Sequence, residues 1–188
     1  MRDSRKTRHT LIIGGARSGK SDYALELALK SPQPVLFVAT AEAGDEEMRQ
    51  RIDAHRRARP DTWETLEATT LVGDRIQQEV GATPTVIVDC ITLLVNNVFN
   101  KYLNSGGELS EPSLVEKDVM AEIGSLVDCI NQAEAGFIVV TNEVGQGLVP
   151  ASNMSRLYRD LLGKANRILA QNTDDVYLMM AGLPVKIK

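Results

Sequence analysis

Residues 14–21 read Gly14-Gly15-Ala16-Arg17-Ser18-Gly19-Lys20-Ser21, and they follow the aliphatic run Leu11, Ile12 and Ile13. This spacing fits GxxxxGK[ST], a glycine-rich loop between a strand and a helix whose backbone N–H groups hold phosphates. We expect Lys20 to neutralise the β and γ phosphates of a nucleotide and Ser21 to bind Mg²⁺. Arg17 has two open interpretations, because its guanidinium can stabilise phosphate charge or point to solvent. The sequence therefore predicts a P-loop that binds a magnesium–nucleotide complex.

Aliphatic runs and helical segments alternate along the rest of the chain. Short runs rich in β-branched residues predict buried strands at 11–13, 35–38, 86–88, 137–140 and 176–180. Helical spacing predicts helices at 20–30, 45–58, 90–103, 113–133 and 154–171. Parallel neighbours need a crossover, which is usually helical, so this alternation predicts an α/β fold with a mostly parallel sheet and helices on both faces. Ligands of such sheets bind beyond the carboxyl ends of the strands.

Length and composition point to one compact domain. The 188 residues are 43% hydrophobic, enough for a single aliphatic core, so we expect an extension at 1–10 and one nucleotide-binding domain at 11–188. A net charge of -4 predicts no general attraction to nucleic acid or anionic lipid. There is no run long enough to span a membrane or to export the chain, so we expect a cytoplasmic protein in which Cys90 and Cys129 are reduced core thiols.

Polar residues follow two of the predicted strands. Asp89 ends the run Thr85-Val86-Ile87-Val88-Asp89, where a P-loop enzyme needs a carboxylate to hold the magnesium shell opposite Ser21. An aspartate at this place is also common as a helix N-cap, and both interpretations stay open. The run at 137–140 leads into Thr141-Asn142-Glu143-Val144-Gly145-Gln146-Gly147, which is either a second wall of the substrate site or an ordinary loop.

The predicted helix at 45–58 carries a histidine among arginines. His55 follows Met48 and Ile52 at helical spacing, so it lies at the edge of an apolar face, and a core histidine is one interpretation. In the other interpretation, nearby positive charge disfavours the imidazolium and leaves a nitrogen free to attack phosphorus. The arginines that could close over phosphates are Arg49, Arg51, Arg56, Arg57 and Arg59.

Five stretches of this chain, taken in order, match those of one enzyme family. They are GGARSGKS, RIDAHRRARPDTWETLEA, VDCITLLVNN, TNEVGQGLVP and GLPVKIK. With them the chain resembles the bifunctional adenosylcobinamide kinases and adenosylcobinamide-phosphate guanylyltransferases of cobalamin biosynthesis, over nearly everything from Leu11 to Lys188. The resemblance implies a RecA-like P-loop domain, assembled as a homotrimer, which phosphorylates adenosylcobinamide and then transfers GMP from GTP to that phosphate.

The resemblance also implies residue roles. The guanylylated histidine of the family falls on His55, so that Lys20 and His55 are the expected catalytic residues, with ATP also open for the kinase step. Some members of the family carry glutamate where this chain has Asp89, and some lack the kinase step, whereas the intact Gly19-Lys20-Ser21 favours both activities here. The implied GTP contacts are Gly14, Gly15, Ala16, Arg17, Ser18, Gly19, Lys20, Ser21, Ala39, Thr40, Ala41, Arg56, Arg57, Ala58, Arg59, Glu67 and Asp89, with Ser21 and Asp89 at Mg²⁺.

Two other functions fit the P-loop. A plain small-molecule kinase would use the loop alone, with His55 structural, and would form no covalent GMP adduct. A nucleotide-dependent binding switch would modify no small molecule, and turnover of cobinamide would exclude it.

Overall fold

A computed structural model describes residues 7–188, apart from the side chains of Glu47 and Arg51, and shows one seven-stranded sheet with the order β3-β2-β4-β5-β1-β6-β7. The strands are β1 (Thr10–Gly14), β2 (Val35–Ala39), β3 (Glu64–Glu67), β4 (Thr85–Asp89), β5 (Gly136–Asn142), β6 (Asp175–Met180) and β7 (Leu183–Lys186). All neighbours pair in parallel except β6 and β7. The helices are α1 (Lys20–Leu29), α2 (Glu46–Arg57), α3 (Val72–Glu79), α4 (Ile91–Asn100), α5 (Pro112–Gln132) and α6 (Asn153–Gln171).

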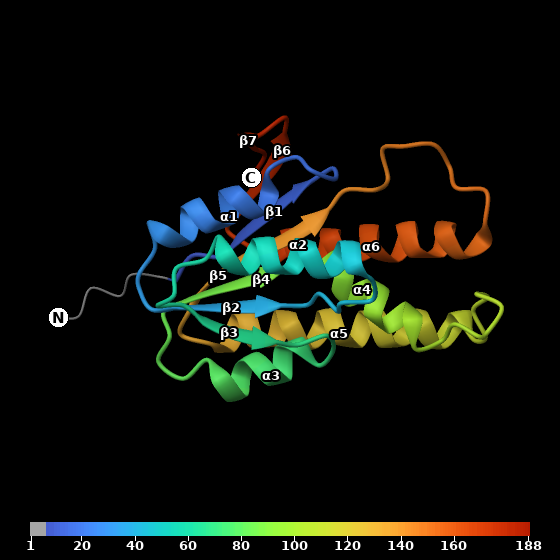
Figure 1. Ribbon diagram of the computed structural model, residues 1–188, viewed down its shortest axis with the longest axis horizontal. Coiled ribbons are helices and arrows are strands. Elements are labelled where there is room, and N and C mark those ends of the chain that lie inside the picture. The colour runs from blue at the N-terminus through green and yellow to red at the C-terminus, as the bar shows by residue number, and fades with distance from the viewer. Residues whose placement is uncertain (1–6) are drawn as a thin grey trace.

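The sheet is covered on both faces (Figure 1). On one face, side chains such as Leu11, Val88 and Val139 pack against α3, α4, α5 and α6 in a large aliphatic core. On the other face, Ile12, Phe37 and Ile138 pack against α1 in a smaller core. Alternate residues of each strand therefore enter different cores, as the two-residue period of a strand requires. The predicted fold class, with a mostly parallel sheet between two helical layers, is confirmed. Among the described residues, no helix is both long and apolar enough to cross a bilayer.

Three elements were not predicted from the sequence. The strand β3 has the sequence ETLE, in which Leu66 is the buried residue, so it has no aliphatic run. The helix α3 spans eight residues, and β7 reads LPVK with every residue exposed. The two strands lie at the ends of the sheet order, where one-sided burial leaves a weak hydrophobic pattern, and α3 is too short to repeat its pattern.

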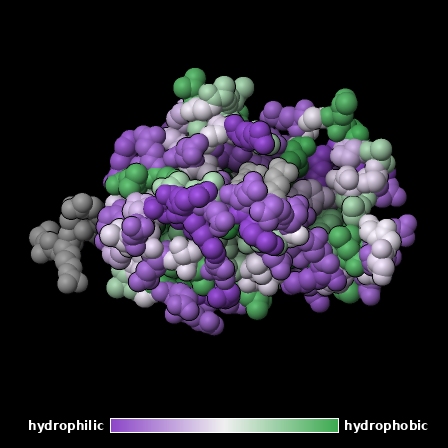
Figure 2. Space-filling view, in the orientation of Figure 1, coloured by the Kyte–Doolittle hydropathy of each residue, from purple (hydrophilic) through white to green (hydrophobic). Residues whose placement is uncertain are grey.

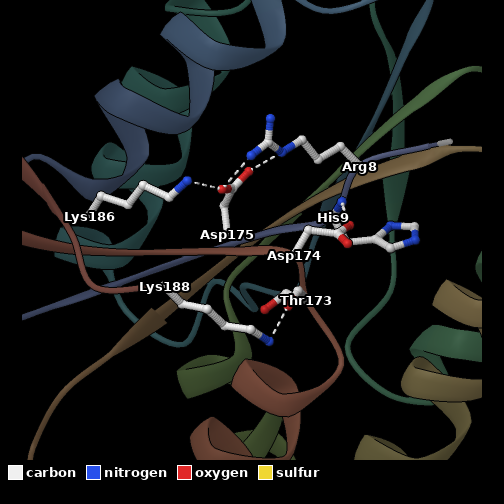
Figure 3. Close-up of polar contacts among 7 residues, drawn as sticks. All are labelled: Arg8, His9, Thr173, Asp174, Asp175, Lys186 and Lys188. Atoms are coloured by element: carbon white, nitrogen blue, oxygen red, sulfur yellow. Dashed lines mark hydrogen bonds and ion pairs between the residues drawn. The ribbon is translucent and has the colours of Figure 1, made fainter. Parts of the chain in front are cut away.

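Residues before β1 contact the C-terminal hairpin (Figure 3). The buried carboxylate of Asp175 forms ion pairs with both Arg8 and Lys186, and the Lys186 Nζ lies 2.6 Å from Oδ1. The backbone N–H of His9 donates to Asp174 Oδ2 at 2.8 Å. Part of the predicted extension is thus fixed against β6, whereas residues 1–6 lie outside the described residues. The division of the chain at residue 10 stays a prediction.

Candidate active site

The P-loop leaves the end of β1, which is buried between β5 and β6, and enters α1 at Lys20. A Cβ on Gly14 would lie 2.7 Å from the carbonyl oxygen of Met179, so only glycine allows this close approach. Gly19 is the N-cap of α1 and has a φ of 88°, which also favours glycine. The Lys20 Nζ donates to the Gly15 carbonyl oxygen at 2.6 Å, which folds the ammonium group back over the loop. The loop therefore has the curved backbone that a phosphate cradle requires.

The carboxylate of Asp89 lies two strands away from the P-loop. Asp89 ends β4, and β5 lies between β4 and β1. The N-cap of α4 is Cys90, and its side chain makes no capping hydrogen bond. The interpretation of Asp89 as a helix N-cap is therefore wrong, and its carboxylate is left for the space beyond the sheet.

Two cavities meet at this edge and share five residues, namely Ser21, His55, Asp89, Cys90 and Asn142. The phosphate-loop cavity, about 480 Å³, extends from them over residues 17–22. The α2 cavity, about 330 Å³, extends from them between α2 and the ends of β2 and β3. His55 is half-buried and lies at the junction of both cavities, so it is not a histidine of the apolar core.

Most of the residues predicted to contact nucleotide line these two cavities. The linings contain Arg17, Ser18, Gly19, Lys20, Ser21, Ala39, Ala41, Arg56, Arg59, Glu67 and Asp89, together with His55. Outside both linings lie Gly14, Gly15, Ala16, Thr40, Arg57 and Ala58. Of these, Thr40 is fully buried, and Arg57 and Ala58 are exposed at the end of α2. Arg51 cannot be compared, because its side chain lies outside the described residues.

Two arginines of the α2 segment differ in their surroundings. Arg56 is exposed and forms an ion pair with Glu67 at the end of β3. The guanidinium carbon of Arg59 lies 3.5 Å from the centroid of the Phe37 ring. Its Nε and Nη1 are buried and have no hydrogen-bond partner among the described residues. Burial lowers the pKa of Arg59, although the nearby Asp89 carboxylate acts in the opposite direction. Arg59 is therefore a cation with unused donors at the wall of the α2 cavity.

Buried polar side chains hold the segments around the cavities in place. The Thr40 hydroxyl donates to the carbonyl oxygen of Cys90 at 2.7 Å and accepts from its N–H at 2.8 Å. From α4, Asn97 Nδ2 donates to the carbonyl oxygens of Thr40 at 2.8 Å and Thr69 at 3.0 Å. One amide therefore joins the segments that follow β2 and β3, which explains why Thr40 supports the site without lining it.

Cys90 and Asn142 line both cavities, and the residue patterns assigned neither of them an individual role. Cys90 packs against the edge of the smaller core, as a core thiol would, and is half-buried where it lines both cavities. Cys129 is buried as expected, and neither cysteine forms a disulfide. Burial and the neighbouring Asp89 carboxylate raise the pKa of the Cys90 thiol to about 11, so the thiol is protonated at neutral pH. Asn142 lies in the segment expected as a second wall, and its carbonyl oxygen accepts from Asn166 Nδ2 at 2.9 Å. The polar run after β5 pointed to the segment that holds Asn142, whereas no pattern pointed to Cys90.

Comparison with known proteins shows the family to which the chain belongs. The family model described as "Cobinamide kinase / cobinamide phosphate guanyltransferase" matches residues 10–187. The chain belongs to this family. As a member of the cobinamide kinase / cobinamide phosphate guanyltransferase family, it is a transferase, and the family resemblance expected from the sequence is confirmed.

Relatives in this family match almost the whole chain. The bifunctional adenosylcobalamin biosynthesis protein CobU of Escherichia coli (strain K12) is 38% identical over 182 residues, which cover 95% of this chain and 98% of the relative. The bifunctional adenosylcobalamin biosynthesis protein CobP of Pseudomonas aeruginosa is 36% identical over 178 residues, which cover 95% and 96%.

Solved structures support the fold alone. The RadB recombinase aligns with a TM-score of 0.50 and 17% identity over 91% of this chain and 73% of RadB. An ATPase from the type III secretion system of pathogenic bacteria aligns with a TM-score of 0.57 and 12% identity over 91% of this chain and 51% of the ATPase. The prediction of a P-loop, RecA-like fold is confirmed.

Proposed function

We propose that this protein phosphorylates adenosylcobinamide and then transfers GMP from GTP to adenosylcobinamide phosphate through a guanylyl group on His55. The observation that carries the proposal is the position of His55 at the junction of the phosphate-loop cavity and the α2 cavity. A nucleophile there can reach a nucleotide whose phosphates lie in the P-loop. The names of the relatives, which describe bifunctional enzymes of adenosylcobalamin biosynthesis, support both activities.

In the kinase step the P-loop positions the γ phosphate of the nucleotide. Backbone N–H groups of residues 15–19 and the N-terminus of α1 bind the phosphates, and Lys20 stabilises the negative charge that develops on the transferred group. GTP is the nucleotide that we expect, and ATP stays open for this step. The product is a phosphate monoester and a nucleoside diphosphate.

The oxygen atoms near the P-loop fit Mg²⁺. Ser21 and Asp89 line the same two cavities, one from α1 and the other from β4. Among the described residues, no three His, Cys, Asp or Glu side chains come together as a closed metal site. Mg²⁺ keeps several waters and commonly takes one or two protein oxygens together with phosphates, so this sparse set is what it prefers. We propose that Ser21 and Asp89 hold Mg²⁺, which would draw negative charge from the phosphates.

In the guanylyl step a ring nitrogen of His55 attacks the α phosphorus of GTP. The N–P bond forms while the bond from that phosphorus to the α,β-bridging oxygen breaks, and pyrophosphate leaves with the electron pair. An oxygen of the substrate phosphate then attacks the same phosphorus and frees the histidine. Arg59 supports this proposal, because its buried, unpaired donors suit a phosphate or another anionic group of the nucleotide.

The test is covalent labelling without a corrinoid. Purified protein is incubated with magnesium and α-³²P-GTP, denatured, and examined for label that is labile in acid and stable in alkali. We expect label on the wild type and none on His55→Ala. His9→Ala is the matched control, since His9 is the other histidine of the chain and precedes β1 at the opposite edge of the sheet. An active wild type without label would leave a simple P-loop kinase, with His55 structural.

Two further properties complete the proposal. We propose a homotrimer, on the resemblance to the family, and sedimentation of the purified protein would test it. A cytoplasmic location, expected from the lack of an export or membrane-spanning run in the sequence, stays a prediction.

A further inference from the structure

A further groove borders the P-loop beside the β6–β7 hairpin. The hairpin groove, about 540 Å³, lies between the segment after β5 and the β6–β7 hairpin. Gly15 and Ser18 of the P-loop form part of its lining, and Ser18 also lines the phosphate-loop cavity. The hairpin rests directly on the loop, because the Gly182 N–H donates to the Ser18 carbonyl oxygen at 3.1 Å. Ser18 therefore lines both the phosphate-loop cavity and the hairpin groove.

The walls of the hairpin groove combine one carboxylate with apolar side chains. Glu143 follows β5, and its backbone N–H donates to the Gly14 carbonyl oxygen at 3.0 Å, so it lies beside the start of the P-loop. Its Oε1 accepts a hydrogen bond from the N–H of Gly145, which fixes the carboxylate and leaves Oε2 without a partner among the described residues. Val144 and Met180 line the groove and are both exposed.

The surroundings of the groove are also unusually apolar for an exposed surface. Most of the exposed large hydrophobic side chains of the described residues belong to the two segments that border it: Val144, Leu148, Val149, Met180, Leu183, Val185 and Ile187. Figure 2 shows green side chains projecting over the β6–β7 hairpin and over the segment that follows β5. Exposed apolar side chains at the groove, such as Val144 and Met180, suit a ligand with apolar faces better than a small polar phosphoryl acceptor.

We propose that the hairpin groove binds the alcohol that accepts the γ phosphate, a bulky substrate with apolar faces, and that Glu143 is the general base for its hydroxyl. This proposal rests on the kinase step proposed above. Phosphoryl transfer needs the attacking and leaving oxygens roughly in line, so the acceptor must approach from the side opposite the nucleotide. The groove adjoins the P-loop through Gly15 and Ser18, so an acceptor bound in it would lie beside the phosphates that the loop holds.

The acceptor hydroxyl, the nucleotide and Glu143 together account for every bond and proton of the proposed kinase step. The hydroxyl oxygen of the acceptor forms a bond to the γ phosphorus, and its proton moves to Glu143 Oε2. The bond from the γ phosphorus to the β,γ-bridging oxygen breaks, and its electron pair leaves with the nucleoside diphosphate. A positioned base of this kind contributes about 10²- to 10⁴-fold in rate.

The test compares Glu143→Gln with Glu134→Gln, an exposed carboxylate at the other end of β5. Glutamine keeps an oxygen for the Gly145 N–H, so the segment retains its local hydrogen bond. With adenosylcobinamide and GTP, we expect Glu143→Gln to lower the kcat of phosphorylation by about 100-fold or more and to abolish the acidic limb of its pH profile. Glu143→Asp should keep that limb, and the guanylyl label on His55 should be unchanged in every variant.

A second comparison tests the apolar wall. Met180→Ser should raise the KM for adenosylcobinamide by roughly three- to tenfold through the lost apolar contact, whereas Leu29→Ser, an exposed leucine at the end of α1, should not. A wild-type kcat and pH profile in Glu143→Gln would overturn the proposal. So would a Met180→Ser variant with unchanged KM and altered sedimentation, because the groove would then be a contact between copies. If the protein lacks the kinase step altogether, the wild type would carry label on His55 but would phosphorylate no corrinoid.

Discussion

Replacing Arg59 with methionine should raise stability and weaken GTP binding together. The Nε and Nη1 groups of Arg59 are buried and have no partner in the part of the chain that the structure describes, and each unsatisfied donor of this kind costs about 1–3 kcal/mol. Stacking on Phe37 offsets about 0.5–2 kcal/mol of that cost. Methionine keeps an apolar contact with Phe37 and removes the donors. At the middle of these ranges the two donors cost about 4 kcal/mol and the stacking offsets about 1 kcal/mol, so we expect the free energy of unfolding to rise by about 3 kcal/mol.

Binding should change in the opposite direction. A charge-assisted hydrogen bond contributes about 1.5–3 kcal/mol, so its loss should raise the Kd for magnesium–GTP by about 10- to 150-fold. Urea unfolding followed by the fluorescence of Trp63, the single tryptophan, gives the first quantity, and titration calorimetry gives the second. Arg167→Met is the matched control, because Arg167 is exposed on α6 and lines neither cavity. An Arg59→Met protein that binds GTP like the wild type would refute the reasoning.

Two further predictions concern buried polar groups. Asn97→Ala leaves two loop carbonyl oxygens without their donor and should lower the free energy of unfolding by about 2–4 kcal/mol, whereas the exposed Asn96→Ala on the same helix should change it by less than about 0.5 kcal/mol. Equal urea midpoints for the pair would contradict this. Burial by itself would raise the pKa of Asp175, but hydrogen bonds from Lys186 and Arg8 outweigh it and lower that pKa. The Asp175 carboxylate therefore stabilises the fold above about pH 4, and this stabilisation is lost as the pH falls through the folded-state pKa. The difference in free energy of unfolding between the wild type and Asp175→Asn should therefore decrease in acid and stay constant above about pH 5.

The sequence predicted the central part of the sheet well for a physical reason. Strands buried on both faces, such as β4 and β5, must be apolar along their length, so they stand out as short aliphatic runs. The elements that were missed, β3, α3 and β7, bury one side or none and carry no such run. Their existence depends on pairing and packing with distant residues.

The candidate site likewise contains some residues that local sequence predicts and others that depend on tertiary contacts. A phosphate loop has local geometry, so Gly14, Gly19 and Lys20 were visible from spacing alone. Asp89 could be predicted because it ends an aliphatic run that marks a buried strand. The meeting of His55 with these residues depends on how α2 lies over the sheet, and spacing left its role open until the family resemblance was considered. The Arg59 stack on Phe37 likewise joins residues whose contact no local pattern contains.

The last strand, β7, bears on how copies of the protein can associate without aggregating. A free strand at the end of a sheet can pair with a strand of another molecule and start a continuous intermolecular sheet. Here that strand is four residues long, contains Pro184 and is followed by Lys188 two residues after Lys186. Short length, proline and lysine are the features by which natural edges resist such pairing. An ordered assembly at this end of the molecule must therefore be built from side-chain contacts, and substitutions that lengthen β7 should lower solubility before they affect catalysis.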